Sequence, residues 1–308
     1  MSAPFPVPYP AAGLPEAVTV YEVGPRDGLQ AEKQLVSTSA KIDFITALRQ
    51  AGLPMVEATS FVSPRWVPQL ADAADVLAGL GGDLSAHPVL VPNLTGLERA
   101  SEAGASTIAV FVSATESFAQ QNLNTTRAGA IGAAQEVTAR ARERGMRVRA
   151  YVSMCFGDTW QGQVPVAEVA HISRELLDAG CYEVSLGDTI GVGTAGHVDA
   201  LIQAHQRLDI AVERLALHLH DTYGQALANV YAGLRAGVRC FDASAGGIGG
   251  CPFAGSATGN LATEDLLWLL AGLQIRTGVD LDAVVRAGAV MTDALGRPRS
   301  RIAAAMLG

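Results

Sequence analysis

Apolar residues follow two alternating patterns along this chain. Five times, a segment with apolar residues at helical spacing ends in a small or charged residue and a glycine, and an apolar run with β-branched residues follows at once. Glycine readily takes the left-handed conformation that closes a helix, so each occurrence predicts a helix, a cap and then a strand. The five glycines are Gly52, Gly104, Gly145, Gly180 and Gly237.

Three further apolar runs, at residues 18–23, 87–91 and 214–220, predict strands without this cap. Helical patterns lie between the strands; in one example Ile42 and Ile45 share a face with Leu48. Eight strands that alternate with helices predict a parallel sheet covered by helices, because parallel strands need crossover connections.

Polar residues at the strand ends distinguish a closed barrel from a doubly wound open sheet. They follow nearly every predicted strand, whereas an open sheet gathers its chemistry at one switch point. We therefore predict the α/β class and a single (β/α)8 TIM barrel over residues 18–308, with C-terminal helices and with the site at the carboxyl ends of the strands. Residues 1–17 contain five prolines and are expected to form a flexible arm.

Composition excludes several kinds of partner. The 308 residues include 22 Lys and Arg against 30 Asp and Glu, a formal net charge of −8, which argues against binding to duplex nucleic acid. The longest uncharged stretch, residues 243–263, is rich in Gly, Ser and Ala, so no membrane span is expected. The four cysteines form no CxxC pair and are too few for a disulfide framework, which indicates a reducing cytoplasm.

Two histidines stand two residues apart in the predicted strand LALHLHD. Side chains alternate along a strand, so His218 and His220 are expected to point to the same side, the barrel interior. A single core histidine is equally well explained by packing. Two of them, with Asp27 from the end of the first strand, predict a divalent-cation site; Mg²⁺ or Mn²⁺ suits these ligands, and Zn²⁺ is an alternative.

Arg26 precedes Asp27 in EVGPRDGLQ, a sequence that predicts a tight turn. An exposed ion pair is the ordinary explanation for such neighbours. Their position at a strand end favours a role in the site instead, because a barrel collects its chemistry there. Glu22 and Glu57, at nearby strand ends, are candidates for the same cluster.

Two glycine-rich segments need separate interpretations. The GxGxxG pattern at residues 191–196 is typical of dinucleotide binding, but it begins several residues after the strand, and a barrel has no switch point, so we reject that function. Residues 246–259 contain six glycines and Cys251, and they predict a lid with a functional thiol. Three cysteines in or beside strands are expected to be packing residues: Cys155, Cys181 and Cys240.

Longer segments carry a resemblance to a known family. From about residue 18 to residue 301 the chain closely resembles the 3-hydroxy-3-methylglutaryl-CoA lyase family, in EVGPRDGLQAEK, VEATSFVSPRWVPQLAD, GCYEVSLGDTIGVGT, LHLHDTYGQALAN and GGIGGCPFAGSATGNLATEDL. The RDG and HxH elements alone would indicate only the wider superfamily of metal-dependent lyase, aldolase and Claisen-type synthase barrels. The segments GGCPFA and GNLATEDL point to the lyases.

The resemblance implies an enzyme that uses Mg²⁺ or Mn²⁺ to cleave 3-hydroxy-3-methylglutaryl-CoA into acetyl-CoA and acetoacetate. It also implies an acyl-CoA as the small-molecule partner, and a homodimer is expected. The positions that match the family's metal ligands are Asp27, His218, His220 and Asn260. The positions that match its catalytic residues are Arg26, Glu57, Asp188 and Cys251. The sequence leaves open whether Cys251 acts as acid, base or both, and whether Asp188 shares the proton.

One segment departs from the family pattern and keeps alternatives open. The chain has YVSMCFGDTWQG where the family commonly has YVSCALGCPYEG, so two cysteines are absent and Trp160 replaces a tyrosine. A sibling lyase acting on another 3-hydroxyacyl-CoA is therefore an alternative. A Claisen-type synthase usually adds a region after the barrel, for which little chain remains. A non-catalytic metal-binding or CoA-binding protein would be expected to have lost some of the named positions.

Overall fold

A single parallel sheet of nine strands forms the centre of the computed structural model, which describes residues 6–250 and 259–308. The strands are β1 (Thr19–Glu22), β2 (Met55–Val56), β3 (Thr59–Ser60), β4 (Val89–Leu90), β5 (Thr107–Ser113), β6 (Arg147–Ser153), β7 (Glu183–Asp188), β8 (Leu215–Leu219) and β9 (Cys240–Ala243). Their order in the sheet is β2-β1-β9-β8-β7-β6-β5-β4-β3, and every pairing is parallel.

The two ends of this sheet meet, because β2 and β3 are parts of one short segment. The residues between them bond to both sides: the N–H of Glu57 donates to the carbonyl of Glu22 at 2.8 Å, and the N–H of Ala58 donates to that of Pro88 at 2.9 Å. The sheet therefore closes into a barrel with eight strand positions, and the second of these is split. This confirms the predicted TIM barrel, and the strand predicted after Gly52 is present as the two short pieces β2 and β3.

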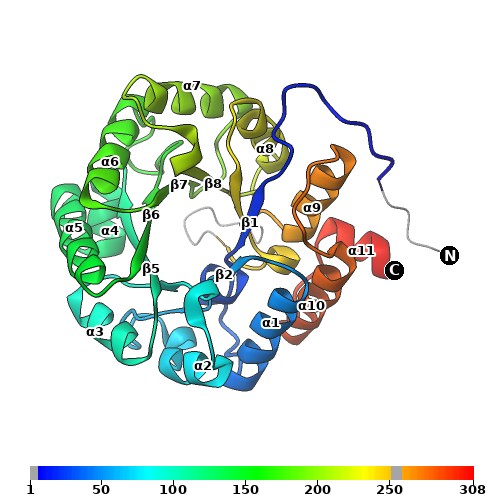
Figure 1. The fold of residues 1–308 in the computed structure, drawn as a ribbon, viewed down its shortest axis with the longest axis horizontal. Coiled ribbons are helices and arrows are strands. Elements are labelled where there is room, and N and C mark those ends of the chain that lie inside the picture. The colour runs from blue at the N-terminus through cyan, green and yellow to red at the C-terminus, as the bar shows by residue number, and fades with distance from the viewer. Residues whose placement is uncertain (1–5, 251–258) are drawn as a thin grey trace.

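Helices surround the barrel as an outer layer (Figure 1). They are α1 (Thr38–Gln50), α2 (Ala73–Leu80), α3 (Leu94–Glu102), α4 (Glu116–Leu123), α5 (Arg127–Glu143), α6 (Val166–Ala179), α7 (Ala195–Gln206), α8 (Ala226–Arg235), α9 (Thr263–Gly272), α10 (Leu281–Ala294) and α11 (Arg301–Leu307). Short helical turns are η1 (Gly24–Gly28), η2 (Pro68–Leu70), η3 (Leu84–Ala86), η4 (Val212–Arg214) and η5 (Ala245–Gly247). None of the described helices is long and apolar enough to cross a membrane.

The five predicted glycine caps are present. All five glycines have a positive φ, from 75° at Gly145 to 109° at Gly180, and the other three lie between these values. A side chain with a Cβ rarely adopts this conformation, so glycine lets the chain turn sharply from helix to strand. The local pattern thus sets the repeating helix-to-strand step of the barrel.

An apolar cluster joins residues of the strands to residues of the surrounding helices, and charged and aromatic side chains meet inside the barrel. Arg149 on β6 contacts Asp242 on β9, although β7 and β8 separate these strands in the sheet. Such a contact has to cross the interior. The Arg149 guanidinium also lies 4.0 Å from the ring centroid of Tyr21 and 4.9 Å from that of Tyr151.

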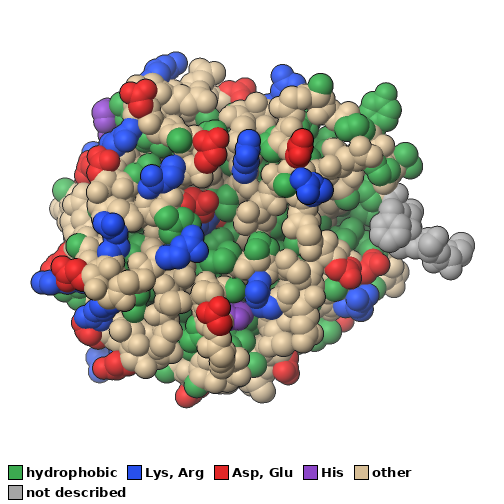
Figure 2. Space-filling model, viewed as in Figure 1, with side chains coloured by type: hydrophobic (Ala, Val, Ile, Leu, Met, Phe, Trp, Pro, Cys, Tyr) green, Lys and Arg blue, Asp and Glu red, His purple; other side chains and the backbone are tan. Residues whose placement is uncertain are grey.

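The described start of the chain runs beside α9, on the side of the molecule where α10 and α11 lie (Figure 1). In the described part of the N-terminal segment, the N–H of Tyr9 donates to the carbonyl of Gly272 at 2.8 Å, and Glu16 accepts a bond from the N–H of Arg276 at 2.9 Å. On the face shown in Figure 2, acidic and basic side chains are interspersed over the helices.

Candidate functional site

The turn after β1 carries Arg26 and Asp27. It is one π-helical turn, η1, in which the N–H groups of Arg26, Asp27 and Gly28 all donate to the carbonyl of Val23, at 3.2, 2.7 and 3.2 Å. A Cβ on Gly28 would lie 2.6 Å from Ile248 Cγ1, so glycine lets the turn pack against the segment after β9. Arg26 is only 6% exposed, and the interpretation as a surface ion pair is therefore wrong.

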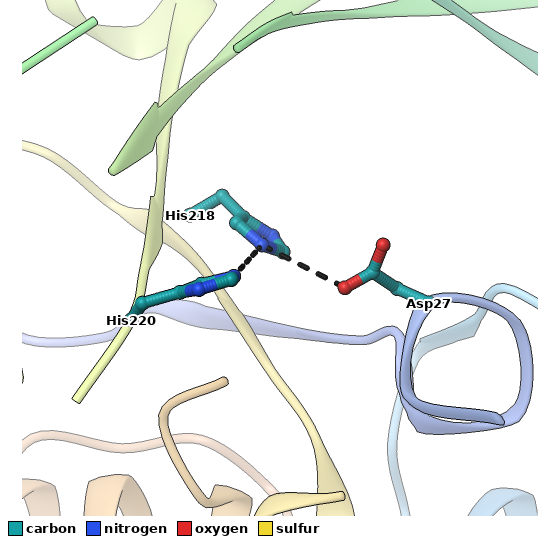
Figure 3. Close-up of side chains that lie close together, drawn as sticks. All are labelled: Asp27, His218 and His220. Atoms are coloured by element: carbon teal, nitrogen blue, oxygen red, sulfur yellow. Dashed lines mark hydrogen bonds and ion pairs between the residues drawn. The ribbon is translucent and has the colours of Figure 1, made fainter. Parts of the chain in front are cut away.

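Strand β8 and the turn η1 bring three predicted ligands together (Figure 3). The Nε2 atoms of His218 and His220 are 3.2 Å apart, and His218 Nε2 lies 3.9 Å from Asp27 Oδ2. One ligand atom from each residue lies within 4.8 Å of the other two. We call Asp27, His218 and His220 the ligand cluster.

Asn260 lies against this cluster. Its Nδ2 donates to Asp27 Oδ2 at 2.9 Å and to the carbonyl of Ile248 at 3.2 Å, and its backbone forms an isolated bridge with His220. Asn260 therefore orients the Asp27 carboxylate. A direct bond from Asn260 to a metal stays a prediction.

The charges in the cluster shift the pKa of each member. Burial would raise the pKa of Asp27, but Arg26 and His218 hold it well below its usual range. Burial lowers the pKa of His220 to about 3, and the charge of His218 contributes to the same shift. For His218, burial lowers the pKa, but the hydrogen bond to Asp242 and the charge of Asp27 outweigh it, so the pKa is raised.

The protonation states of Asp27 and His220 suit a divalent cation. Metals bind deprotonated carboxylates and neutral imidazoles, and near pH 7 the shifts favour an ionised Asp27 and a neutral His220. The Nε2 atoms of His218 and His220 face each other at 3.2 Å, so both can be directed at one cation. The side chain of Asp27 is 26% exposed, which leaves the cluster open on one side.

Glu57 holds Arg26 in place. Its Oε1 accepts a bond from Arg26 Nε, and its Oε2 accepts bonds from the hydroxyls of Tyr151 at 2.6 Å and Tyr21 at 3.4 Å. Arg26 Nη1 donates to Asp27 Oδ1 at 2.5 Å. Glu57 is fully buried, so two carboxylates fix the guanidinium in one orientation beside the ligand cluster.

Two charged residues of the site were missed by the sequence analysis. Asp242 on β9 lies opposite His218 in register, and its Oδ2 is 3.3 Å from His218 Nδ1. Arg149 on β6 donates to both oxygens of Asp242, at 2.7 and 3.2 Å. A charged residue inside an apolar strand is the signal that identifies both, because buried charges are rarely unpaired.

Asp188, at the end of β7, closes the loop that follows it. Its two carboxylate oxygens accept bonds from the N–H groups of Val192 and Gly193, at 2.9 and 3.0 Å. A Cβ on Gly193 would lie 2.8 Å from Asp188 Oδ2. The glycine pattern thus encloses a carboxylate of the protein, in agreement with the rejection of a dinucleotide site. Burial raises the pKa of Asp188 to about 6.

Glu22 does not join Glu57, contrary to the expectation. Its carboxylate accepts bonds from the N–H groups of Gly24 at 2.7 Å and Ala245 at 2.9 Å, and from the Thr263 hydroxyl at 2.7 Å. The period of a strand explains this, because Tyr21 points into the barrel and the next residue points to the opposite side. Burial raises the pKa of Glu22 to about 7.

The structure describes three of the four cysteines. Cys251 lies outside the described residues. The other three are buried and form no disulfide with one another, which agrees with their prediction as packing residues: Cys155, Cys181 and Cys240.

Comparisons with known proteins agree in sequence and in fold. The HMGL-like family model matches residues 17–291. The 3-hydroxy-3-isohexenylglutaryl-CoA/hydroxy-methylglutaryl-CoA lyase of Pseudomonas aeruginosa is 49% identical over 96% of this chain and 98% of its own length. The mitochondrial hydroxymethylglutaryl-CoA lyase of Arabidopsis thaliana is 48% identical over 96% of this chain, which spans 63% of that relative. A crystal structure of hydroxymethylglutaryl-CoA lyase from Pseudomonas aeruginosa has a TM-score of 0.93 at 49% identity, covering 96% of this chain and 99% of that chain.

Proposed function

Because this chain belongs to the HMGL-like family, we propose that it is a carbon-carbon lyase that cleaves 3-hydroxy-3-methylglutaryl-CoA into acetyl-CoA and acetoacetate. The family resemblance seen in the sequence is confirmed by the match over residues 17–291. The observation that carries the proposed activity is that one carboxylate, Asp27, lies in the ligand cluster and also bonds to the buried guanidinium of Arg26.

The reaction needs positive charge at two oxygens. The C3 hydroxyl loses its proton, and the C2–C3 bond breaks with its electron pair going to C2. Acetoacetate departs and the enolate of acetyl-CoA remains. The C2 atom of this enolate then takes up a proton. The ligand cluster and Asn260 would hold a divalent cation, Mg²⁺ or Mn²⁺. The chemistry that such a cation supplies, when bound, is Lewis-acid polarisation of the C3 oxygen.

Arg26 is assigned to the second oxygen, that of the developing enolate. Its bonds to Glu57 and Asp27 use Nε and Nη1 among the described residues, and we assign Nη2 to the substrate. Burial would lower the pKa of Arg26, but Glu57 and Asp27 keep it raised, so the guanidinium stays charged. A fixed charge that needs no reorientation during the reaction stabilises a developing oxyanion most effectively.

Cys251 and Asp188 are the proposed proton carriers. Both oxygens of Asp188 accept backbone N–H bonds from the loop after β7. These bonds support a second role for Asp188, which is to order this loop. For Cys251, the support is its position in the family's glycine-rich segment. A Cys251→Ser variant separates the two, because Asp188 remains intact in it.

A second candidate substrate is a 3-hydroxyacyl-CoA with a longer group at C3. The observation in its favour is the name of the Pseudomonas aeruginosa relative, which includes an isohexenyl substrate, together with the departure at residues 151–162. In this segment Trp160 is half exposed, and Met154, directly after β6, is buried with a φ of 60°.

The proposal is tested by measuring acetoacetate release and acetyl-CoA formation from each of several 3-hydroxyacyl-CoA esters, with Mg²⁺ or Mn²⁺. Cleavage of the methyl substrate is the expected result. A preference for the isohexenyl substrate would identify the sibling lyase. Free thiol released from acetyl-CoA and a keto acid, without cleavage of any ester, would contradict lyase activity.

A cytoplasmic homodimer is also part of the proposal. The support for a reducing compartment is that the described cysteines are free thiols. Light scattering on the purified protein measures the oligomeric state, and a mass of one chain would contradict the dimer.

A further inference from the structure

Asp242 lies behind the ligand cluster, inside the barrel and 1% exposed. Arg149 donates to its Oδ1 at 2.7 Å and to its Oδ2 at 3.2 Å, and Ser185 Oγ donates to Oδ2 at 2.8 Å. The same Oδ2 lies 3.3 Å from His218 Nδ1. The buried carboxylate of Asp242 therefore connects the fully enclosed guanidinium of Arg149 to His218 of the ligand cluster.

The partners of this carboxylate decide the state of the His218 ring. The Arg149 guanidinium donates to both oxygens of Asp242 and the Ser185 hydroxyl donates to Oδ2, so the carboxylate is paired with a positive charge and accepts hydrogen bonds. His218 Nδ1 must then carry the proton. In a neutral ring this leaves the lone pair on Nε2, the atom that faces His220 and Asp27.

We propose that Asp242, held by Arg149 and Ser185, is a positioning residue that fixes His218 with its proton on Nδ1 and its Nε2 lone pair directed into the ligand cluster. This inference rests on the proposed function, in that it takes the cluster to be a cation site. A carboxylate behind a ligating histidine orients the ring and makes it a stronger ligand.

The two histidines differ in this respect. Among the described residues, His220 Nδ1 is buried without a hydrogen-bond partner, whereas His218 Nδ1 has Asp242. Of the two histidines, a change at Asp242 is therefore expected to act on His218 and not on His220.

The alternative is that Asp242 only neutralises the buried charge of Arg149. Glu183 provides the matched control, because its Oε1 accepts a bond from Arg149 Nε at 2.6 Å and, in the described residues, it makes no bond to His218. Asp242→Asn and Glu183→Gln each remove one negative charge from beside the same guanidinium. Only Asp242→Asn presents an amide to His218.

The experiment is a titration of each folded protein with Mn²⁺ alone, followed by water-proton relaxation, so that no turnover is needed. In Asp242→Asn the amide oxygen stays with Arg149 and the NH₂ group faces Nδ1, which moves the ring proton to Nε2. We expect about 10-fold to 100-fold weaker Mn²⁺ binding. Glu183→Gln should bind Mn²⁺ like the parent.

A second measurement needs no variant at Asp242. With ¹⁵N-labelled histidine and bound Mg²⁺, NMR of the parent should show His218 with a proton on Nδ1 and none on Nε2, the signals being assigned with His220→Gln. A proton on Nε2, or equal Mn²⁺ affinity in Asp242→Asn and the parent, would overturn this inference and leave the cation site standing. A parent that binds no Mn²⁺ would overturn both.

Discussion

The two tyrosines that donate to Glu57 allow a graded test of how Arg26 is positioned. Tyr151→Phe removes a hydroxyl 2.6 Å from Glu57 Oε2, whereas Tyr21→Phe removes one that is 3.4 Å from the same atom. Both variants keep the aromatic ring against Arg149, so neither leaves a large cavity. The pair isolates the effect of hydrogen-bond length on one buried carboxylate.

The distances predict unequal losses. A hydrogen bond to a charged group contributes about 1.5–3 kcal/mol, and we expect Tyr151→Phe to lower the free energy of unfolding by this amount. The Tyr21 hydroxyl lies beyond the usual O–H···O range of about 2.5–3.0 Å, so its loss should cost less than about 0.5 kcal/mol. Because Glu57 orients Arg26, turnover should fall about 10-fold to 100-fold in Tyr151→Phe and little in Tyr21→Phe.

Urea unfolding with the metal chelated measures the first quantity, and kcat at saturating 3-hydroxy-3-methylglutaryl-CoA and Mn²⁺ measures the second. Equal losses in the two variants would refute the reasoning, because they would show that the shorter bond contributes nothing more. A Tyr151→Phe variant with reduced stability and parental kcat would mean that Glu57 does not position Arg26.

Four further changes test other parts of the site. His220→Ala should abolish Mn²⁺ binding seen by water-proton relaxation while circular dichroism stays parental, and equal affinity would remove His220 from the ligands. Arg26→Lys should lose about 10²-fold to 10³-fold in kcat because an ammonium cannot reproduce the planar fork, and retention of more than about a tenth would assign the enolate to the cation. Burial raises the pKa of Glu22 from 4.5 to about 7, so the folded state holds an extra proton between these values and the free energy of unfolding falls as pH rises through them. Glu22→Gln should therefore show a smaller fall in urea midpoint from pH 4.5 to 8 than the parent; an identical fall would contradict this. Cys251→Ser should keep Mn²⁺ binding and lose turnover, and alkylation of Cys251 should inactivate unless a substrate analogue protects; parental turnover of the variant would make Asp188 the proton carrier.

Local physics explains what the sequence by itself determined about this protein. A glycine cap requires only its own backbone conformation, so the five helix-to-strand steps follow from neighbouring residues. The period of two on a strand likewise places His218 and His220 on one face before any partner is known. The place of Asp27 beside these histidines follows from the rule that the strands of a barrel end at a common face.

Only the tertiary structure decided which buried side chains hold these residues in place. Arg149 and Asp242 are separated by 93 positions in the chain, and Glu57 and Tyr151 by 94, so no local pattern relates them. Each is an isolated charge or hydroxyl in an apolar run until the barrel closes. Closure then brings strands that are not neighbours in the sheet to face one another across a buried interior, where an unpaired charge is too costly, and this cost selects the partners.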